Sequence, residues 1–279
     1  MVVVVVYDRG LDAVAAWPIL EAELQRHGIE RIRLERVLIY DNTEVSRARP
    51  MADIPGCDYL HDRTNGGTAA AYVAAAAMAA ESGIEWLLLL DQDTVLTDAF
   101  IDGIDAVLRT AVSPVPAALV ARVFQGSKLI SPARVSCFGT ISPLRDVREH
   151  GADRLTAISS GTILNVAMFN ELLPLPRGLW LDYVDHWIFA RLHFRGGVLL
   201  ILDQTLQHDL SVADLSSLTR QRLFSILNGE ACFNSALGGK ARIAYPLRLA
   251  ARIIRYAFVK PQLAIASAAW IGRRLSVRQ

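Results

Sequence analysis

The sequence is short of cysteine, and this limits the kinds of site that it can build. Its 279 residues contain three cysteines, Cys57, Cys137 and Cys232, which lie far apart and form neither a CxxC pair nor a zinc-binding spacing. We therefore expect no disulfide framework and no structural zinc site, and a reducing compartment is the simpler interpretation. Lysine is equally scarce, with three residues, so arginine carries nearly all of the positive charge.

Long apolar runs and a targeting segment are also missing. No stretch of eighteen uninterrupted apolar residues is present, so we expect no membrane-spanning helix. The run Val2–Val6 follows no basic segment, which favours a first β-strand over a signal peptide. The formal net charge of +1 gives no general attraction to nucleic acid, and we expect no nucleic-acid partner. A hydrophobic content of 52% leaves enough apolar side chains for a large core.

Acidic residues are absent from residues 240–279, which contain nine basic ones. Arg248, Arg252 and Arg255 fall on one helical face, and the residues opposite them are Leu249, Ile253, Ile254 and Phe258. A basic amphipathic helix of this kind can rest on an anionic membrane, so we expect such a contact through residues 240–275. The alternative is a helix that packs on the core with its arginines in solvent. The sequence leaves both interpretations open.

Strand-like and helix-like segments alternate over the first 110 residues. This pattern predicts an α/β fold with a Rossmann-like, doubly wound and mostly parallel sheet. The expected strands are 2–6, 37–40, 59–60, 85–90, 117–124 and 198–202, with short hairpins within 126–142. The expected helices are 12–26, 69–81 and 98–110, followed by two that end near residues 173 and 195. We expect one domain over 1–212 and a helical, basic C-terminal extension over 213–279.

The stretch from Trp86 to Val95 organises the predicted site. Its apolar run ends at Asp91 and Asp93, and an apolar run of this length suits a strand that is buried on both faces. Asp8 and Asp41 follow two other predicted strands, and right-handed crossovers would bring these strand ends to one edge of the sheet. Two carboxylates at such an edge suit Mg²⁺ or Mn²⁺ with substrate phosphates. These residues alone are compatible with more than one chemistry.

Five motifs in order resemble those of a family-two glycosyltransferase of the GT-A fold, over roughly residues 2 to 210. They are Tyr7-Asp8, Asp41-Asn42-Thr43, Asn65-Gly66-Gly67, Asp91-Gln92-Asp93 and Asp182-Tyr183-Val184-Asp185. Within that family, the last motif and the tail are most similar to bacterial rhamnosyltransferases. The resemblance implies an inverting transfer of a sugar, with L-rhamnose as the first guess, from a dTDP- or UDP-linked donor to a saccharide hydroxyl in surface polysaccharide synthesis.

The resemblance also implies a role for each motif residue. Asp185 would be the general base, and Asp93 would bind the metal with help from His208. The donor would be bound by Tyr7, Asp8, Asp41, Asn65, Gly66, Gly67, Asp91 and Gln92. Acceptor binding or support would come from Asp182, Trp180 and Arg191, although helix capping explains Asp182 at least as well. A lipid-linked acceptor would place the enzyme in the cytoplasm, peripheral on the inner membrane.

A phosphatase of the haloacid dehalogenase type is the main alternative. The stretch from Leu90 to Val95 also fits its Asp-x-Asp-x-Thr motif, with Asp91 as a nucleophile that forms an aspartyl-phosphate. Lys128 would then supply the lysine that such enzymes need. Their motif usually stands on the first strand of the domain, however, and here other strand–helix units precede it. This alternative also leaves Asp41 and Asn65 without a purpose.

Overall fold

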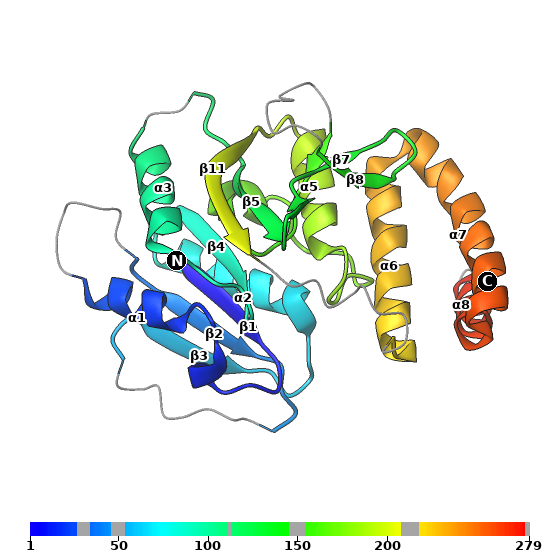
Figure 1. Ribbon diagram of the computed structural model, residues 1–279, viewed down its shortest axis with the longest axis horizontal. Helices are drawn as coiled ribbons and strands as arrows, with labels where there is room; N and C mark the ends of the chain where they lie inside the picture. The colour runs from blue at the N-terminus through cyan, green and yellow to red at the C-terminus, as the bar shows by residue number, and fades with distance from the viewer. Residues whose placement is uncertain (27–33, 46–53, 111–112, 145–153, 208–217, 277–279) are drawn as a thin grey trace.

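The computed structural model describes residues 1–26, 34–45, 54–110, 113–144, 154–207 and 218–276. A large sheet forms its centre, with strand order β11-β5-β10-β4-β1-β2-β3 and β6 paired to β5 (Figure 1). The strands are β1 Val2–Val6, β2 Val37–Asp41, β3 Cys57–His61, β4 Trp86–Asp91, β5 Ala118–Gln125, β6 Lys128–Ser131, β10 Thr162–Asn165 and β11 Leu199–Gln207. Strands β6 and β10 run antiparallel to their neighbours, and the other pairs are parallel. The prediction of a mostly parallel α/β sheet is therefore confirmed.

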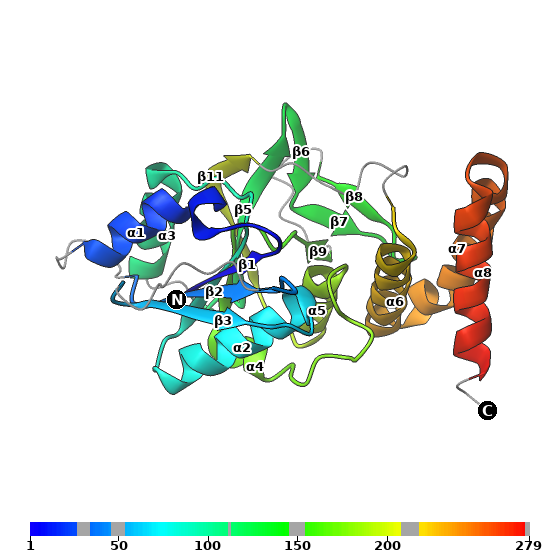
Figure 2. The same ribbon diagram turned by 90° about the horizontal axis from the view of Figure 1, so that it is seen from below.

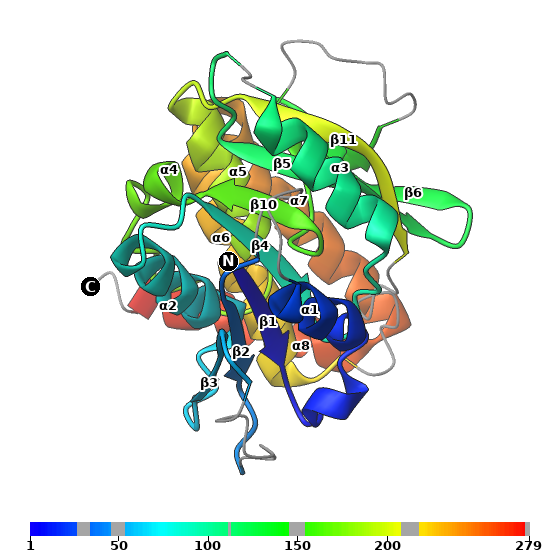
Figure 3. The same ribbon diagram turned by 90° about the vertical axis from the view of Figure 1, so that its left-hand side faces the viewer.

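Helices cover both faces of this sheet (Figure 3). The bounds are η1 Leu11–Ala13, α1 Trp17–Gln25, α2 Gly67–Glu81, α3 Asp98–Arg109, α4 Val166–Asn170 and α5 Val184–Phe194. Val3 and Val5 pack in the layer that contains α2, α4 and α5, whereas Val2, Val4 and Val6 pack with α1 and α3. Alternate side chains of a strand point to opposite faces, so a strand covered on both sides needs an unbroken apolar run.

A second, small sheet and three C-terminal helices complete the described chain. The small sheet has the order β8-β7-β9, with bounds Ile141–Pro143, Ala133–Val135 and Leu155–Thr156. The helices are α6 Arg220–Leu237, α7 Gly239–Val259 and α8 Pro261–Ser276, and they lie at the end of the molecule farthest from α1 (Figure 2). The expected domain boundary at residue 212 lies outside the described residues and stays a prediction. Across the described ranges, no helix is long and apolar enough to cross a membrane.

Two predicted helices differ from the observed ones. The helix expected over 12–26 is a short 3-10 turn followed by α1, which begins at Trp17. Pro18 lies in the first turn of α1, where its fixed φ and missing amide hydrogen are tolerated, and this sets the helix start. The helix expected to end near residue 173 stops at Asn170, before the proline-containing segment that follows. The three cysteines are free thiols, as expected.

Phe100 tests the packing of α3 on the sheet. Its side chain is fully buried, and Thr97 caps the helix by accepting a hydrogen bond from the Phe100 amide. Phe100→Ala should lower the free energy of unfolding by about 3–5 kcal/mol, because it removes a buried ring and leaves a cavity. Urea denaturation would measure the loss. Val115→Ala is the control, since Val115 is exposed and its loss should stay within about 0.5 kcal/mol. Equal, small losses for both variants would contradict the packing described.

Candidate functional site

The ends of β1, β2 and β4 meet at one edge of the sheet, as the sequence predicted. In the strand register, Val5 lies opposite Asp91 and Val6 lies opposite Asp41. We call this edge, where Asp41 and Asp91 end their strands and Asp8 and Asp93 follow theirs, the carboxyl edge. In open α/β sheets, ligands bind outside the carboxyl ends of the strands.

Gln92 connects the loops at this edge through hydrogen bonds. Its side-chain oxygen accepts a hydrogen bond from the Tyr7 amide at 2.8 Å, and its carbonyl accepts one from the Ala15 amide at 3.0 Å. The Asp8 amide donates in turn to the hydroxyl of Thr43 at 2.8 Å. The loop after β1 is thus tied to the loops after β4 and β2, while the Tyr7 side chain itself remains exposed. The predicted donor contacts of Tyr7, Asp8 and Gln92 stay predictions.

Asp41 is buried at the end of β2, with both carboxylate oxygens engaged. One oxygen accepts from the Thr43 amide at 2.8 Å and the other from the Tyr59 hydroxyl at 2.5 Å. Burial alone would raise the pKa of Asp41, but these hydrogen bonds outweigh it, and the pKa is lowered. An ionised Asp41 therefore organises this strand end. Its predicted contact with a nucleotide base stays a prediction.

Three residues other than glycine have left-handed backbones among those described, and all three belong to the predicted motifs. They are Asp8, Asn65 and Tyr183, with φ angles of 56°, 52° and 64°. This conformation is uncommon for residues with a Cβ atom, and such strain clusters at functional sites. Asp8 lies in the loop after β1, Asn65 in the loop before α2 and Tyr183 in the loop before α5.

The turn before α2 is closed by Trp180 from the segment before α5. The indole nitrogen of Trp180 donates to the Asn65 carbonyl at 2.5 Å, and the Trp180 carbonyl accepts from the Ala69 amide at 3.0 Å. Gly67 has a φ of +71°, and a Cβ atom there would lie 2.4 Å from the Trp180 carbonyl oxygen. Glycine is therefore required for contact with Trp180, a partner that the sequence did not reveal.

The amides of this turn are already hydrogen-bonded within the protein. The Gly66 amide donates to Asp62 and the Gly67 amide donates to the side chain of Asn42, at 2.8 and 2.9 Å. Asp62 also accepts from the Tyr40 hydroxyl at 2.8 Å. Burial would raise the pKa of Asp62, but its hydrogen bonds hold it at about 2. Sequence reasoning missed Asp62; its only signal was a carboxylate directly after a short strand.

Asp91 and Asp185 converge on two adjacent serines. The Ser160 hydroxyl donates to Asp91 at 2.6 Å, and the Ser159 amide donates to Asp185 at 3.1 Å. Because β10 runs antiparallel, the segment before it lies at the carboxyl edge, where Gly161 bonds to the Leu89 carbonyl. Nothing in the sequence alone indicated a role for these serines in the site.

Tyr72 is a further buried group beside these carboxylates. It lies on α2 and its side chain is completely buried. Burial, together with the negative charges of Asp91 and Asp185, raises the pKa of its hydroxyl well above the usual value, although the nearby Ser159 hydroxyl counteracts this. Tyr72 therefore stays protonated. The only sequence signal was an aromatic residue inside an alanine-rich helix.

Asp185 lies in the first turn of α5 and keeps its side chain about one-sixth exposed, at 17%. Besides the Ser159 amide, its carboxylate accepts a hydrogen bond from the His186 amide at 2.7 Å. The His186 ring is held in place by the Thr156 hydroxyl at 2.7 Å. An accessible carboxylate with fixed orientation is the arrangement that a general base needs.

Asp182 does not cap α5, which corrects one of the two interpretations of this residue. The residue before the helix is Tyr183, and it makes no side-chain cap. Asp182 is buried, with one oxygen 2.8 Å from a guanidinium nitrogen of Arg222 on α6. Burial raises the pKa of Asp182, and the Arg222 charge only partly offsets this.

Helices α6 and α7 support the loop between Asp182 and Asp185. The Tyr183 hydroxyl donates to Glu230 on α6 at 3.1 Å, and Glu230 binds Arg252 on α7 through two hydrogen bonds of 3.0 and 2.7 Å. A Cβ atom at Gly229 would lie 2.3 Å from the Asp182 carbonyl oxygen, so α6 approaches the loop closely. The expectation that Arg252 faces solvent or membrane is therefore wrong. Burying its guanidinium requires the matching charge of Glu230.

Two other predicted residues do not join this cluster. Arg191 lies toward the far end of α5 and stacks over the exposed Phe194 ring, 5.2 Å from its centroid. It lies six positions after Asp185 in the helix, or about 9 Å along the axis. His208 lies outside the described residues, so its metal contact stays a prediction.

The metal site can be judged from the chemistry of its donors. Within the described segments, no three or more His, Cys, Asp or Glu side chains gather as metal ligands. Asp91 and Asp93 offer two hard oxygen donors at the carboxyl edge, which fit Mg²⁺ or Mn²⁺ when substrate phosphates supply further ligands. The donor set therefore suits a metal that binds together with its substrate.

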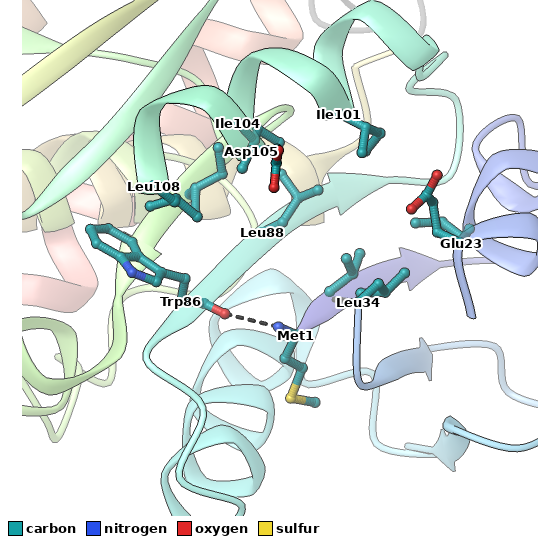
Figure 4. Close-up of a pocket in the computed structure, with 12 residues that line it drawn as sticks. Met1, Glu23, Leu34, Trp86, Leu88, Ile101, Ile104, Asp105 and Leu108 are labelled. Atoms are coloured by element: carbon teal, nitrogen blue, oxygen red, sulfur yellow. Dashed lines mark hydrogen bonds between the residues drawn. The ribbon is translucent and has the colours of Figure 1, made fainter. Parts of the chain in front are cut away.

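A pocket in the structure lies at the opposite edge of the sheet and is separate from this site (Figure 4). It is lined mainly by apolar side chains from the starts of β1 and β4 and from α1 and α3, including Leu20, Leu88, Ile101 and Ile104. Met1 and Trp86 also line it, and the Met1 amine donates a hydrogen bond to the Trp86 carbonyl at 2.9 Å (Figure 4). None of the predicted site residues lines it.

Glu230→Gln tests the support of the Asp182–Asp185 loop. The change should lower the free energy of unfolding by about 1–3 kcal/mol, because Arg252 loses its charged partner in a half-buried position. Urea denaturation measures the loss. The double variant Glu230→Gln with Arg252→Met should lose less free energy of unfolding than the sum of the two single-variant losses. Glu171→Gln is the control, since its ion pair with Arg195 is exposed and worth at most about 1 kcal/mol. If the losses of the Glu230 and Arg252 variants simply add in the double variant, the contact between these two side chains is contradicted.

Comparison with solved structures shows which proteins share this fold. The chain is similar to GalNAc-T7 (TM-score 0.52, 11% identity, 85% of this chain and 47% of that one) and to TarS 1-349 of S. aureus (0.50, 11%, 97% and 91%). It is also similar to the mannosyltransferase PcManGT of Pyrobaculum calidifontis (0.50, 13%, 99% and 74%). The chain thus spans about half the length of GalNAc-T7. No protein-family model and no curated protein matches the sequence. The shared architecture is that of the glycosyltransferases, and this chain has the GT-A fold.

Proposed function

We propose that the protein is an inverting, metal-dependent glycosyltransferase that uses a nucleotide-diphosphate sugar. The observation that carries the proposal is the convergence of Asp91 and Asp185 on Ser159 and Ser160, at the carboxyl edge of a GT-A sheet. Asp91 ends β4 and begins the Asp91-Gln92-Asp93 motif, and Asp185 lies in the first turn of α5. A donor and an acceptor could therefore meet between them.

Two of the similar structures support the choice of donor and cofactor. The GalNAc-T7 structure contains UDP, GalNAc and Mn²⁺, and the PcManGT structure contains GDP-Man and Mn²⁺. Both pair a nucleotide with a divalent metal. Asp93 would hold Mg²⁺ or Mn²⁺ here, with Asp91 as a neighbouring contact to the donor, and the bound metal would neutralise charge on the departing nucleoside diphosphate.

Asp185 is the base in this proposal. Its carboxylate would accept the proton of the acceptor hydroxyl as that oxygen attacks the anomeric carbon. The Ser159 and His186 amides fix its orientation, so that the basic oxygen can point to the bound acceptor. A direct attack of this kind inverts the anomeric configuration and needs no second catalytic carboxylate, unlike glycoside hydrolysis.

The finer identity of the substrates rests on the resemblance of the motifs. We propose L-rhamnose from a dTDP- or UDP-linked donor, with a saccharide hydroxyl of a growing bacterial surface polysaccharide as acceptor. A lipid-linked acceptor would be met in the cytoplasm, by an enzyme resting on the inner membrane. The phosphatase alternative has less support, because β1, β2 and β3 all precede the Asp-x-Asp strand and Lys128 is exposed at the turn between β5 and β6.

Asp185→Asn tests the base. Transfer should fall by about 10²–10⁴-fold, because the amide cannot take the proton of the acceptor. Nucleotide release would be followed with a panel of nucleotide sugars and Mn²⁺, and donor binding by thermal shift should be kept. Asp203→Asn is the matched control, since Asp203 is exposed on β11. Unchanged transfer in Asp185→Asn would show that the base is another group.

Asp91→Asn distinguishes the glycosyltransferase from the phosphatase. The transferase proposal expects weaker donor and metal binding, seen as a smaller thermal shift with Mn²⁺ and nucleotide sugar, and no turnover of phosphomonoesters by the unsubstituted protein. Phosphomonoester turnover that disappears in Asp91→Asn, without any nucleotide-sugar binding, would establish the phosphatase instead.

A further inference from the structure

Helix α7 presents an apolar face to the outside of the molecule. Ile243, Leu247, Ile254 and Phe258, which we call the apolar stripe, are 75%, 73%, 61% and 85% exposed. Their spacing of four, seven and four residues places them on one side of the helix. Thirteen large hydrophobic residues are exposed in the described chain, and six of them lie within 243–265. Scattered exposed hydrophobics are normal, whereas a continuous row marks a surface that is normally covered.

The opposite face of α7 is bound to the protein. Tyr245, Leu249 and Tyr256 are buried in a cluster shared with α6 and α8. Arg248 donates to the Asn234 side chain at 2.6 Å, and Arg252 binds Glu230, so both arginines face α6. The helix cannot turn its stripe inward without breaking these contacts. The stripe is therefore a fixed surface feature. It includes Ile254 and Phe258 of the apolar face expected from the sequence, whereas Leu249 of that face is buried.

Exposed basic residues accompany the stripe on α7, and others lie on the neighbouring helix α8. Exposed basic residues on α7 and α8 are Lys240, Arg242, Arg255, Arg273 and Arg274, and Glu230 is the last acidic residue of the chain. We propose that the apolar stripe docks on an anionic lipid bilayer, with the stripe inserted at the headgroup boundary and the flanking basic residues at the headgroups. A row of apolar side chains with basic neighbours is the composition of interfacial helices.

A second copy of this chain fits the surface less well. Pairing two stripes would bring together two helical segments that are both rich in arginine and contain no acidic residue after Glu230. Like charges facing each other oppose association. An anionic bilayer offers both an apolar layer and the opposite charge.

Docking through α7 would also orient the site. The inner face of the same helix contacts the Asp182–Asp185 loop through Arg252, Glu230 and Tyr183. The base would thus be held at a fixed position relative to the lipid surface. This last consequence rests on the proposed function and its lipid-linked acceptor, whereas the docking itself does not.

Sedimentation with vesicles tests the docking. The full chain should bind vesicles of phosphatidylcholine and phosphatidylglycerol at least tenfold more tightly than vesicles of phosphatidylcholine alone. Leu247→Ser combined with Phe258→Ser should weaken this binding at least tenfold, and Arg255→Gln should weaken it about fivefold. Val115→Ser is the control, because it removes an exposed apolar residue elsewhere and should leave binding unchanged. Circular dichroism checks that each variant is folded.

Three outcomes would overturn the proposal. One is that the full chain binds neither kind of vesicle, and another is that the double substitution leaves binding unchanged. The third is that size-exclusion chromatography shows a dimer that the double substitution converts to a monomer, without vesicle binding. Vesicle binding needs neither donor nor turnover. Transfer to a soluble saccharide should be the same for the full chain and the double variant, so failure of the proposed function and failure of the docking give different results.

Discussion

The site depends on the burial of β1 and β4 on both faces. Apolar layers from α1 and α3 on one side and from α2, α4 and α5 on the other leave no solvent along these strands. A carboxylate within them would lose its hydration without a partner, at a cost far above that of a neutral side chain. Charged groups are therefore excluded until the strands end. Parallel direction then sets Asp41 and Asp91 on either side of β1, at the same edge.

Much of this arrangement could be predicted because it follows from local pattern. Unbroken valine and leucine runs mark doubly covered strands, and an aspartate after such a run marks a strand end. The direction of a strand has no such signal, because an antiparallel strand covered on both faces has the same apolar composition. This is why the sequence did not reveal that the segment before β10 brings Ser159 and Ser160 to Asp91 and Asp185.

Contacts between distant segments escaped prediction for a related reason. Helical spacing placed Arg248 and Arg252 on one face correctly, but it could not show which face α6 covers. The pairing with Glu230 depends on how α6 and α7 pack, which the period of one helix does not contain. Trp180 was expected to bind or support the acceptor, and this role stays a prediction, but the sequence did not show that its indole nitrogen binds the Asn65 carbonyl. In both cases a polar group found a partner far along the chain.

The contact between Gly67 and Trp180 has a consequence for how the site responds to its ligands. Gly67 belongs to the segment predicted to bind the donor, and Trp180 belongs to the segment that leads to the base. The Ala69 amide donates to the Trp180 carbonyl and the Trp180 indole nitrogen donates to the Asn65 carbonyl, so a shift of one segment alone would break hydrogen bonds to the other. A displacement caused by one substrate would be passed directly to the binding place of the other. Ordered binding of donor and acceptor could then arise from one glycine–tryptophan contact, without a mobile lid.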